Sequence, residues 1–482
     1  MNIIKESLLT EEEARKYKLS LRECILGDKR FYTHVAAVVI PIVVQNTLTN
    51  IVGLLDNVMV GQVGTIPMSA VAIVNQLFFV LYLAMWGATA GAGIYTTQFF
   101  GKGDYEGVRT TIRFKSIILS IIFFAAFIIF VFGGNALVEL YISADTSAYD
   151  REQTLMYARQ YMLIMIPGLI PFFFTNLVAT TMREAGKTVL PMKASIAAMI
   201  INFILNALLI FGLFCFPKMG VAGAAVATSI SRLAELMIII IGALRKRKDY
   251  AFFAGTIKDF KLPFADAKAI FMKSVPLLFN EFFWALSQAV LLQCYSVRGI
   301  AVIAAMNICN TISQIFNDAY LSLGTSASII CGQQLGAGKL VEARRSAWRM
   351  AVISVTSCLV LGSILFIIAP VIPHLYNTED EIRQMATVFI RVLALCMPFF
   401  AFSNAAYFII RSGGRVFVTM LFDGVFAWGV SVPVAFVLAN FTGLSAINIY
   451  ACVCLAEFAK SIAGFILVKS SIWVKNLVRG ET

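Results

Sequence analysis

The stretch VPLLFNEFFW, residues 275–284, places a carboxylate, Glu281, inside a run that otherwise has the composition of a membrane-spanning helix. A charged side chain at the middle of a bilayer costs about 2.5–3.5 kcal/mol on insertion scales, so such residues usually face a cavity and carry function. The stretch has a counterpart 235 positions earlier, where Pro276 corresponds to Pro41 and Glu281 to Asn46. We therefore expect two copies of one structural unit, which differ at the position of the charge.

The composition is that of a protein with many membrane spans. The 482 residues are 59% hydrophobic and only 14% charged, whereas soluble proteins have about 25% charged residues. The net charge of +12 would also suit a nucleic-acid-binding protein. In a membrane protein it is better explained by the lysines and arginines that collect in cytoplasmic loops, and we expect no nucleic-acid partner.

Apolar runs of about 20 residues or more recur from residue 34 to the end of the chain, each long enough to cross roughly 30 Å of hydrocarbon. Residues 1–32 are polar, and Thr10 followed by Glu13 fits a capping box, which predicts a short helix over about 11–25 on the membrane surface. The runs predict twelve transmembrane helices, at 34–57, 66–98, 112–140, 157–182, 188–213, 219–244, 267–296, 300–332, 345–374, 383–410, 416–440 and 444–472.

The distribution of basic residues predicts the orientation. Most of the 39 Lys and Arg fall in the two tails and the even-numbered loops, so both termini are expected in the cytoplasm. The expected location is the plasma membrane, which is the inner membrane if the protein is bacterial. The opposite side has six: Arg151, Arg159, Lys218, Arg298, Arg383 and Arg391. The expected organisation is a cytoplasmic segment 1–32, an N-terminal lobe 33–244, a cytoplasmic loop 245–266, a C-terminal lobe 267–474 and a cytoplasmic tail 475–482.

The repeat can be followed along most of both lobes. Six helices is an even number, so both copies enter the membrane in the same direction, as parallel repeats around a central cleft. At an offset of 235 the matches are Pro41 with Pro276, Gly64 with Gly299, Asn75 with Asn310, Gln98 with Gln333, Gly101 with Gly336, Gly103 with Gly338 and Arg109 with Arg344. At shorter offsets, Asn176 matches Asn404, Arg183 matches Arg411, Gly186 matches Gly414 and Glu235 matches Glu457.

Four acids, Asp56, Glu281, Asp318 and Asp423, lie well inside the expected spans, and none has a Lys or Arg partner in the same span. An unpaired buried acid either stays protonated or binds a cation. Both states suit a transporter that couples proton or sodium entry to movement of a substrate. The structural alternative is a protonated acid that is hydrogen-bonded for packing, or an acid exposed at a helix end.

Two amides accompany these acids. Asn202 and Asn206 lie four residues apart and therefore on one helix face, where their oxygens can help ligate a sodium ion. Alternatively, they form interhelical hydrogen bonds, worth about 0.6 kcal/mol each in membranes. The nine cysteines form no C-x-x-C motif, so neither a disulfide framework nor a zinc site is expected, and no cofactor is.

Together, these features resemble the MATE family, the multidrug and toxic compound extrusion transporters. The resemblance covers about residues 31–475. The most specific matches are LLDNVMVG around Asp56, QFFGKG and QQLGAG at 98–103 and 333–338, REAGKT from Arg183, NFILNALLIFG at 202–212, GVAGAAVAT ending at Thr228, and NEFF around Glu281.

The resemblance implies export of drugs, often organic cations, in exchange for Na⁺ or H⁺ by alternating access. It also implies a cation site made of Asp56, Asn202, Asn206 and Thr228, with Na⁺ held at the first three. Some members have an aspartate where this chain has Asn206. Another branch pairs the acid at Glu281 with an acid on helix 10, which is Asn404 here. Asp423, on the next helix, and Asp318 are further candidates for binding the substrate or a second ion, and the choice of ion stays open.

Three other functions are less consistent with the sequence than drug export. A flippase for lipid-linked sugars or precursors usually needs basic residues in its cavity, and we expect no Lys or Arg near the middle of any span. A membrane enzyme would show H-E-x-x-H or acid-rich D-D-x-x-D motifs, which do not occur, so the chain is not expected to be an enzyme. A purely structural protein or receptor would not need the repeat and the buried acids. We expect a monomer that binds small-molecule drugs within the lipid bilayer.

Overall fold

The structure is a computed structural model, and it describes residues 9–143, 146–256, 260–376 and 378–478. The first residues of the expected cytoplasmic segment and the last four of the expected tail lie outside these ranges. Within them, the chain forms helices and turns but no strands, which confirms the all-helical class. The long helices are α4 (Lys29–Gly61), α5 (Thr65–Lys102), α6 (Tyr105–Glu139), α7 (Ala148–Glu184), α8 (Val189–Phe211), α9 (Val221–Arg245), α10 (Phe264–Ser296), α11 (Ile300–Gly336), α12 (Leu340–Ile368), α13 (Asp380–Ser412) and α16 (Ala446–Ser470), together with a further helix over Val416–Phe441.

Eleven of the described helices are long and apolar enough to span a membrane. The twelfth long helix, α11, falls below that hydropathy because it carries polar side chains at Asn307, Asn310, Asn317 and Asp318. Several helices extend beyond the expected spans, since polar residues at their ends continue the helical turns. The eleventh expected span, Val416–Phe441, is irregular: α14 (Val416–Met420) runs into two π-helical segments, η3 (Leu421–Val425) and η4 (Ala427–Ser431), before α15 (Val432–Phe441).

The polar segment before α4 forms two short helices instead of the expected one. In α2 (Glu11–Lys16), the predicted capping box is confirmed, because the Thr10 hydroxyl accepts from the Glu13 N–H and the Glu13 carboxylate accepts from the Thr10 N–H. The Thr10 N–H and hydroxyl also hold the pKa of Glu13 below its usual value. A second capping box at Ser20 starts α3 (Leu21–Ile25), and it interrupts the helix expected over 11–25.

The chain folds into two compact units. The first unit comprises Met1–Val43, Ile94–Asp104 and Phe271–Thr482, and the second comprises Val44–Gly93 and Tyr105–Ile270. Three helices, α4, α5 and α10, contribute to both units. The end of α5 that carries Gln98 and Gly101 thus packs with the C-terminal half of the chain.

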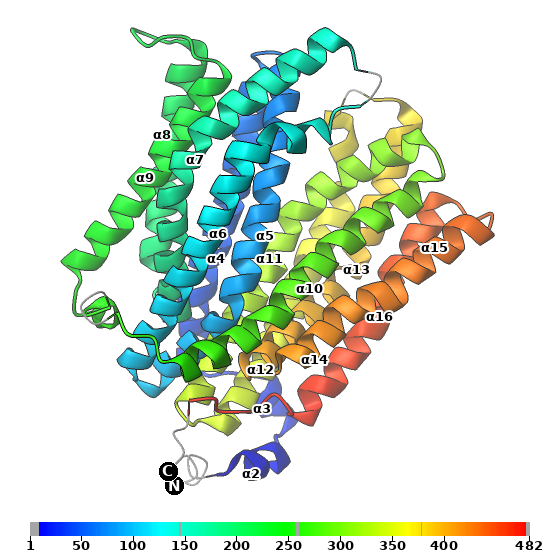
Figure 1. The fold of residues 1–482 in the computed structure, drawn as a ribbon. Helices are drawn as coiled ribbons and strands as arrows, with labels where there is room; N and C mark the ends of the chain where they lie inside the picture. The colour runs from blue at the N-terminus through cyan, green and yellow to red at the C-terminus, as the bar shows by residue number, and fades with distance from the viewer. Residues whose placement is uncertain (1–8, 144–145, 257–259, 377, 479–482) are drawn as a thin grey trace. The chain divides into compact units, whose positions relative to one another are not determined.

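In the first unit, α11, α12, α13 and α16 pack against one another, and α2 and α3 pack on α12. Figure 1 shows α3 and the red C-terminal segment close to the same end of α12. Arg344 of α12 donates to the backbone oxygens of Ala14 (2.6 Å) and Tyr17 (2.8 Å). The C-terminal segment joins this assembly, because the Asn476 N–H donates to Glu11 and Arg15 donates to the Val474 oxygen. Both ends of the described chain therefore lie at one end of this unit.

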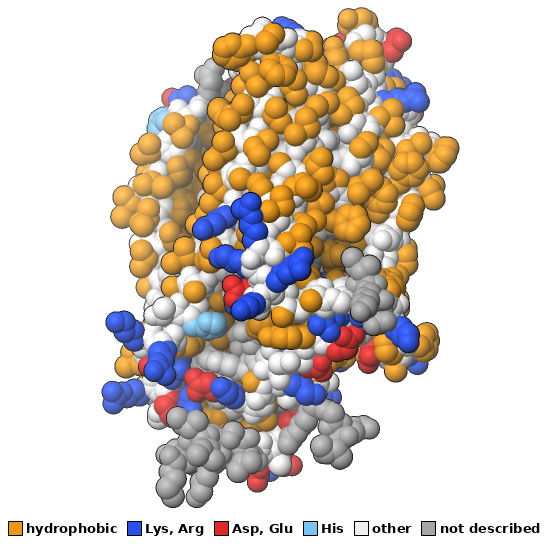
Figure 2. Space-filling model, turned by 90° about the vertical axis from the view of Figure 1, so that its left-hand side faces the viewer, with side chains coloured by type: hydrophobic (Ala, Val, Ile, Leu, Met, Phe, Trp, Pro, Cys, Tyr) orange, Lys and Arg blue, Asp and Glu red, His pale blue; other side chains and the backbone are white. Residues whose placement is uncertain are grey.

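In the second unit, α7 packs on α6 and α9, and α8 packs on α9. Large apolar side chains point away from the protein along α9 at helical spacing: Ile230, Leu233, Met237, Ile240, Ile241 and Leu244. Four exposed basic residues, 245–248, follow them at the end of the helix. Figure 2 shows such a face, largely covered by hydrophobic side chains, with Lys and Arg gathered in its lower part. This pattern is typical of a helix whose outer face contacts lipid and whose end reaches the polar boundary.

Candidate functional site

The second unit brings together the four residues of the cation site implied by the family resemblance. Asp56 comes from α4, Asn202 and Asn206 from α8, and Thr228 from α9. The Asn206 amide Nδ2 lies 2.5 Å from Asp56 Oδ1 and 3.1 Å from Asn202 Oδ1. Asn202 in turn donates to the Thr228 hydroxyl over 3.3 Å. The i, i+4 spacing on α8 therefore brings the two amides into contact, and Asn206 is the one that bonds directly to Asp56.

One oxygen of this cluster has no partner. Asn206 is fully buried, and its Oδ1 accepts no hydrogen bond from any described residue. An unsatisfied buried acceptor is costly, on the order of 1–3 kcal/mol, and calls for an explanation such as an ion or water. With the Asp56 carboxylate, the Asn202 oxygen and the Thr228 hydroxyl, the cluster offers only oxygen acceptors to a ligand, which is the chemistry that a hard cation requires.

A basic residue lies near this cluster, contrary to expectation. Arg232 stands at the middle of α9, where it donates to the Tyr82 hydroxyl over 2.7 Å and lies 4.5 Å above the Phe172 ring. It follows Thr228 of the cluster by one helical turn of α9. The expectation that no Lys or Arg lies near the middle of a span is therefore wrong. Arg232 lies inside an apolar run of the sequence. Its aromatic partners come from α5 and α7, so no pattern around Arg232 itself indicates these contacts.

The second unit contains a further, half-buried acid inside a span that was not among the four predicted from the sequence. Glu235 accepts a 2.5 Å hydrogen bond from the Ser195 hydroxyl, which itself accepts one from Gln45 over 2.8 Å. These side chains join α9, α8 and α4. The set of four acids inside spans was therefore too small, and it also lacked Glu457. The match between Glu235 and Glu457 in the repeat was the signal that could have identified both.

The first unit contains a separate ionic cluster around Asp423. Lys460 of α16 places its Nζ 2.8 Å from Asp423 Oδ1 and 3.7 Å from Glu457 Oε2. Asp423 lies in the π-helical segment η3, and its Oδ2 accepts from Asn280 of α10 over 3.0 Å. Asp423 has no basic partner in its own span, as expected, but it has one from a neighbouring helix. Lys460 is a second basic residue well inside a span.

Asn280 fixes the backbone beside this ion pair. Its Oδ1 accepts the Gly424 N–H over 3.1 Å, and its Nδ2 also lies 3.3 Å from the Tyr407 hydroxyl. A π-helical turn leaves backbone groups without their regular α-helical partners, and such turns are frequent at functional sites. Asn280, next to Glu281 in the opening stretch, thus contacts Asp423 and its neighbour directly.

Glu281 is connected to this cluster through its chain neighbour Asn280. Its carboxylate forms no hydrogen bond or ion pair with the rest of the described chain, whereas the preceding residue, Asn280, bonds to Asp423. The side chains of its neighbours Phe282 and Trp284 are exposed. The structure therefore joins Asp423 to an ionic network by direct contact, and it places Glu281 beside that network only as the chain neighbour of Asn280.

The two remaining candidates of the first unit are Asn404 of α13 and Asp318 of α11. Asn404 has a buried Oδ1 without a partner in the described residues, and this atom packs against Gly324. For Asp318, the backbone oxygen accepts the Ser322 hydroxyl over 2.6 Å. The Asn404 Oδ1 therefore accepts no hydrogen bond from Lys460 in the part of the chain that the structure describes.

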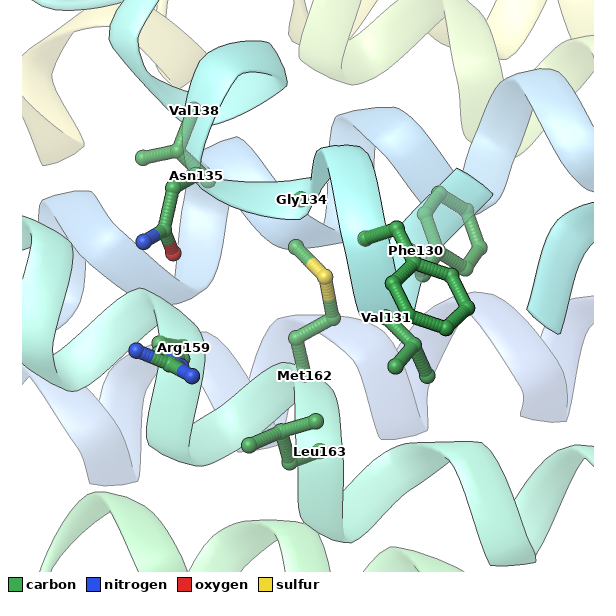
Figure 3. A pocket seen from close by; sticks show the side chains of 9 residues that line it. Phe130, Val131, Gly134, Asn135, Val138, Arg159, Met162 and Leu163 are labelled. Carbon is green, nitrogen blue, oxygen red and sulfur yellow. The ribbon is translucent and has the colours of Figure 1, made fainter. Parts of the chain in front are cut away.

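A small cavity of about 130 Å³ lies elsewhere in the second unit, between α6 and α7. Figure 3 shows the Met162 side chain directed toward Gly134, while Asn135 and Arg159 lie to one side. A Cβ at Gly134 would come within 2.8 Å of the Met162 sulfur, so glycine lets the two helices approach. None of the predicted site residues lines this cavity, and it is too small for a drug-sized ligand.

Comparison with known proteins assigns the fold to a family. The MatE family model matches residues 41–208 and 276–437, which are equivalent portions of the two repeats. The probable multidrug resistance protein YoeA of Bacillus subtilis is 26% identical over 423 residues, covering 85% of this chain and 88% of that protein. The probable multidrug resistance protein NorM of Thermotoga maritima is 22% identical over 443 residues, covering 91% and 92%.

Solved structures show the same fold. An outward-facing multidrug resistance MATE family transporter superposes with a TM-score of 0.80 at 17% identity, over 94% of this chain and 98% of that one. A MOP superfamily transporter from Pyrococcus furiosus, described as having a binding pocket of reverse polarity and a different function, superposes equally well, with the same identity and coverage. With its family model matched in both repeats, the chain belongs to the MATE family of multidrug efflux transporters.

Proposed function

We propose that this protein exports organic cations in exchange for Na⁺ or H⁺, and that the exchanged cation binds at Asp56, Asn202, Asn206 and Thr228. The observation that carries the proposal is the unpartnered, fully buried Oδ1 of Asn206 beside the Asp56 carboxylate. A cation bound beside Asp56, or a proton on Asp56, would give the Asn206 Oδ1 the partner that it lacks. Alternating access needs only that ion and drug prefer different facing states.

A cationic substrate is supported by the acids and aromatic rings of the first unit. Asp423, Glu457 and Glu281 contribute carboxylates, and Lys460 is the base that pairs with the first two. Relatives named as multidrug resistance proteins support drug export over the flippase alternative. Lys460 is neutralised by acids, so it does not supply the free positive charge that an anionic lipid-linked precursor would require.

The proposed orientation puts both termini in the cytoplasm of a bacterial plasma membrane. Two observations support it. The N-terminal and C-terminal segments are hydrogen-bonded to each other at one end of the first unit, as an even number of spans requires. The basic residues 245–248 are exposed at the end of α9, where the positive-inside rule places the cytoplasm.

Transport by the purified protein in liposomes tests the proposal. Ethidium movement is driven first by an imposed sodium gradient and then by a proton gradient. Asp56→Asn should reduce ion-driven ethidium transport at least tenfold, because the amide carries no charge to exchange. Asp266→Asn, at an exposed position in the first turn of α10, is the matched control and should transport normally. Full ion-driven transport by Asp56→Asn would overturn the proposed coupling site.

A further inference from the structure

The Asp423 cluster has the chemistry of a cation-binding site that the chain itself fills. Two carboxylates, Asp423 and Glu457, lie within ion-pair distance of one ammonium group, Lys460 Nζ. The same ammonium lies 5.6 Å from the Phe422 ring centroid and 5.9 Å from that of Phe426. Carboxylates combined with aromatic faces are the groups that recognise organic ammonium ions.

The cluster has one more acid than base. One ammonium shared between two carboxylates leaves it able to accept a further positive charge. Lys460 is already closer to Asp423 than to Glu457, by 2.8 Å against 3.7 Å. Glu457 lies one helical turn before Lys460 on α16, so the lysine can reach it by rotating its side chain alone.

The two carboxylates are held differently. Asp423 is fixed by Asn280 on one oxygen and by Lys460 on the other. Glu457 contacts Lys460 at the longer distance and is the less tightly held member of the pair. The side chains keep partial exposure, 20% for Asp423, 18% for Glu457 and 13% for Lys460, so the cluster is not sealed within the helix packing.

We propose that Asp423, with Phe422 and Phe426, binds the ammonium group of a cationic drug, and that Lys460 is an internal competitor that moves to Glu457 when the drug binds. In the empty protein, Lys460 neutralises Asp423. In the drug complex, the drug's positive charge takes this place and Lys460 pairs with Glu457. The complex then contains two ion pairs, one between the drug and Asp423 and one between Lys460 and Glu457. This inference rests on the proposed export of organic cations and specifies the residues that recognise them.

The competition gives Lys460 and Glu457 opposite effects on binding. Removing the competitor should tighten binding, although the lysine is the residue nearest to Asp423. Removing Glu457 should weaken binding, because the displaced lysine then has no second partner. If the ion pair were purely structural, both variants would change the stability of the protein, and neither would change its affinity for the drug.

Fluorescence anisotropy tests the proposal by measuring equilibrium binding of ethidium to the full-length protein. The measurement is made in detergent, where no ion gradient exists. Lys460→Met should lower the dissociation constant by about tenfold, the gain expected if Asp423 is free about a tenth of the time in the native protein. Glu457→Gln should raise it, and Asp423→Asn in the Lys460→Met background should remove the gain. Lys460→Arg should resemble the native protein, because it keeps the charge.

Lys469→Met is the matched control. Lys469 is on the same helix and lies 5.8 Å from the Phe465 ring, but it is exposed and pairs with no described acid. Thermal unfolding of each variant establishes that it is folded, and Glu457→Gln keeps the test decisive if Lys460→Met is unstable. Unchanged or weaker ethidium binding in folded Lys460→Met, or unchanged binding in Glu457→Gln, would overturn the competition. Failure of the native protein to bind ethidium would instead count against the proposed cationic substrate.

Discussion

Gly101 of α5 and Gly336 of α11 pack reciprocally on each other's helices. A Cβ at Gly101 would lie 1.9 Å from the backbone oxygen of Gln333, and a Cβ at Gly336 would lie 1.9 Å from the backbone oxygen of Gln98. The same four residues form two of the matches of the repeat at an offset of 235, Gln98 with Gln333 and Gly101 with Gly336. The repeats therefore meet across a local two-fold relation within the first unit, at a crossing that only glycine permits.

Gly336→Ala should destabilise the protein strongly. The added methyl group would collide with backbone, which cannot move aside as a flexible side chain can. We expect a loss of about 2 kcal/mol or more, within the range of overpacking effects. Gly133→Ala is the control, because a Cβ there meets nothing within 4 Å, and it should be neutral or slightly stabilising. The midpoint of thermal unfolding in detergent measures both, and equal midpoints would contradict the reciprocal crossing.

Lys115 and Glu184 should depend on each other. Lys115 is fully buried on α6, and its Nζ lies 2.5 Å from the carboxylate of Glu184 at the end of α7. Breaking a buried pair by removing one partner costs about 3–5 kcal/mol, whereas replacing both can be nearly neutral. Lys115→Met should therefore lower the unfolding midpoint more than Lys115→Met combined with Glu184→Gln. A double variant less stable than the single one would show that the pair is not coupled in this way.

The sequence predicts the helices and the repeat better than it predicts the ionic contacts. Long apolar runs and a constant offset are local or periodic signals, so the spans and the match of Gly101 with Gly336 could be identified directly. The i, i+4 spacing of Asn202 and Asn206 likewise anticipated their contact. Asp423 itself could be identified from the sequence as an acid inside a span. Its ion pair with Lys460 joins two different helices, and the π-helical turn around it is bonded to Asn280 of a third, so neither the ion pair nor the turn has a local sequence signal.

Arg344→Gln should release the N-terminal helices from the first unit. Arg344 donates to the last carbonyls of α2, and a neutral glutamine is too short to reach both. Its repeat counterpart, Arg109, pairs with Glu106 and donates to the backbone oxygen of Ala251, so it contacts a different segment and not α2. Hydrogen exchange of the α2 amides should rise at least tenfold in Arg344→Gln. The exposed Arg22→Gln is the control, and protection of α2 that is equal in the two variants would contradict the role of Arg344.

Asn206→Asp should strengthen cation binding at the cluster around Asp56. The new carboxylate would stand where Nδ2 now donates to Asp56 Oδ1 over 2.5 Å, so two acids would face each other without a hydrogen between them. Such a pair must share a proton or bind a cation, because like charges at this distance repel strongly. We expect higher sodium affinity, measured as ²²Na⁺ binding to the purified protein. Because protons compete for the same carboxylates, the sodium concentration needed for half-saturation should rise as the pH falls. Asn448→Asp, exposed at the start of α16, is the control and should change neither. Sodium binding that is unaffected by Asn206→Asp at every pH would show that these oxygens do not hold the exchanged ion.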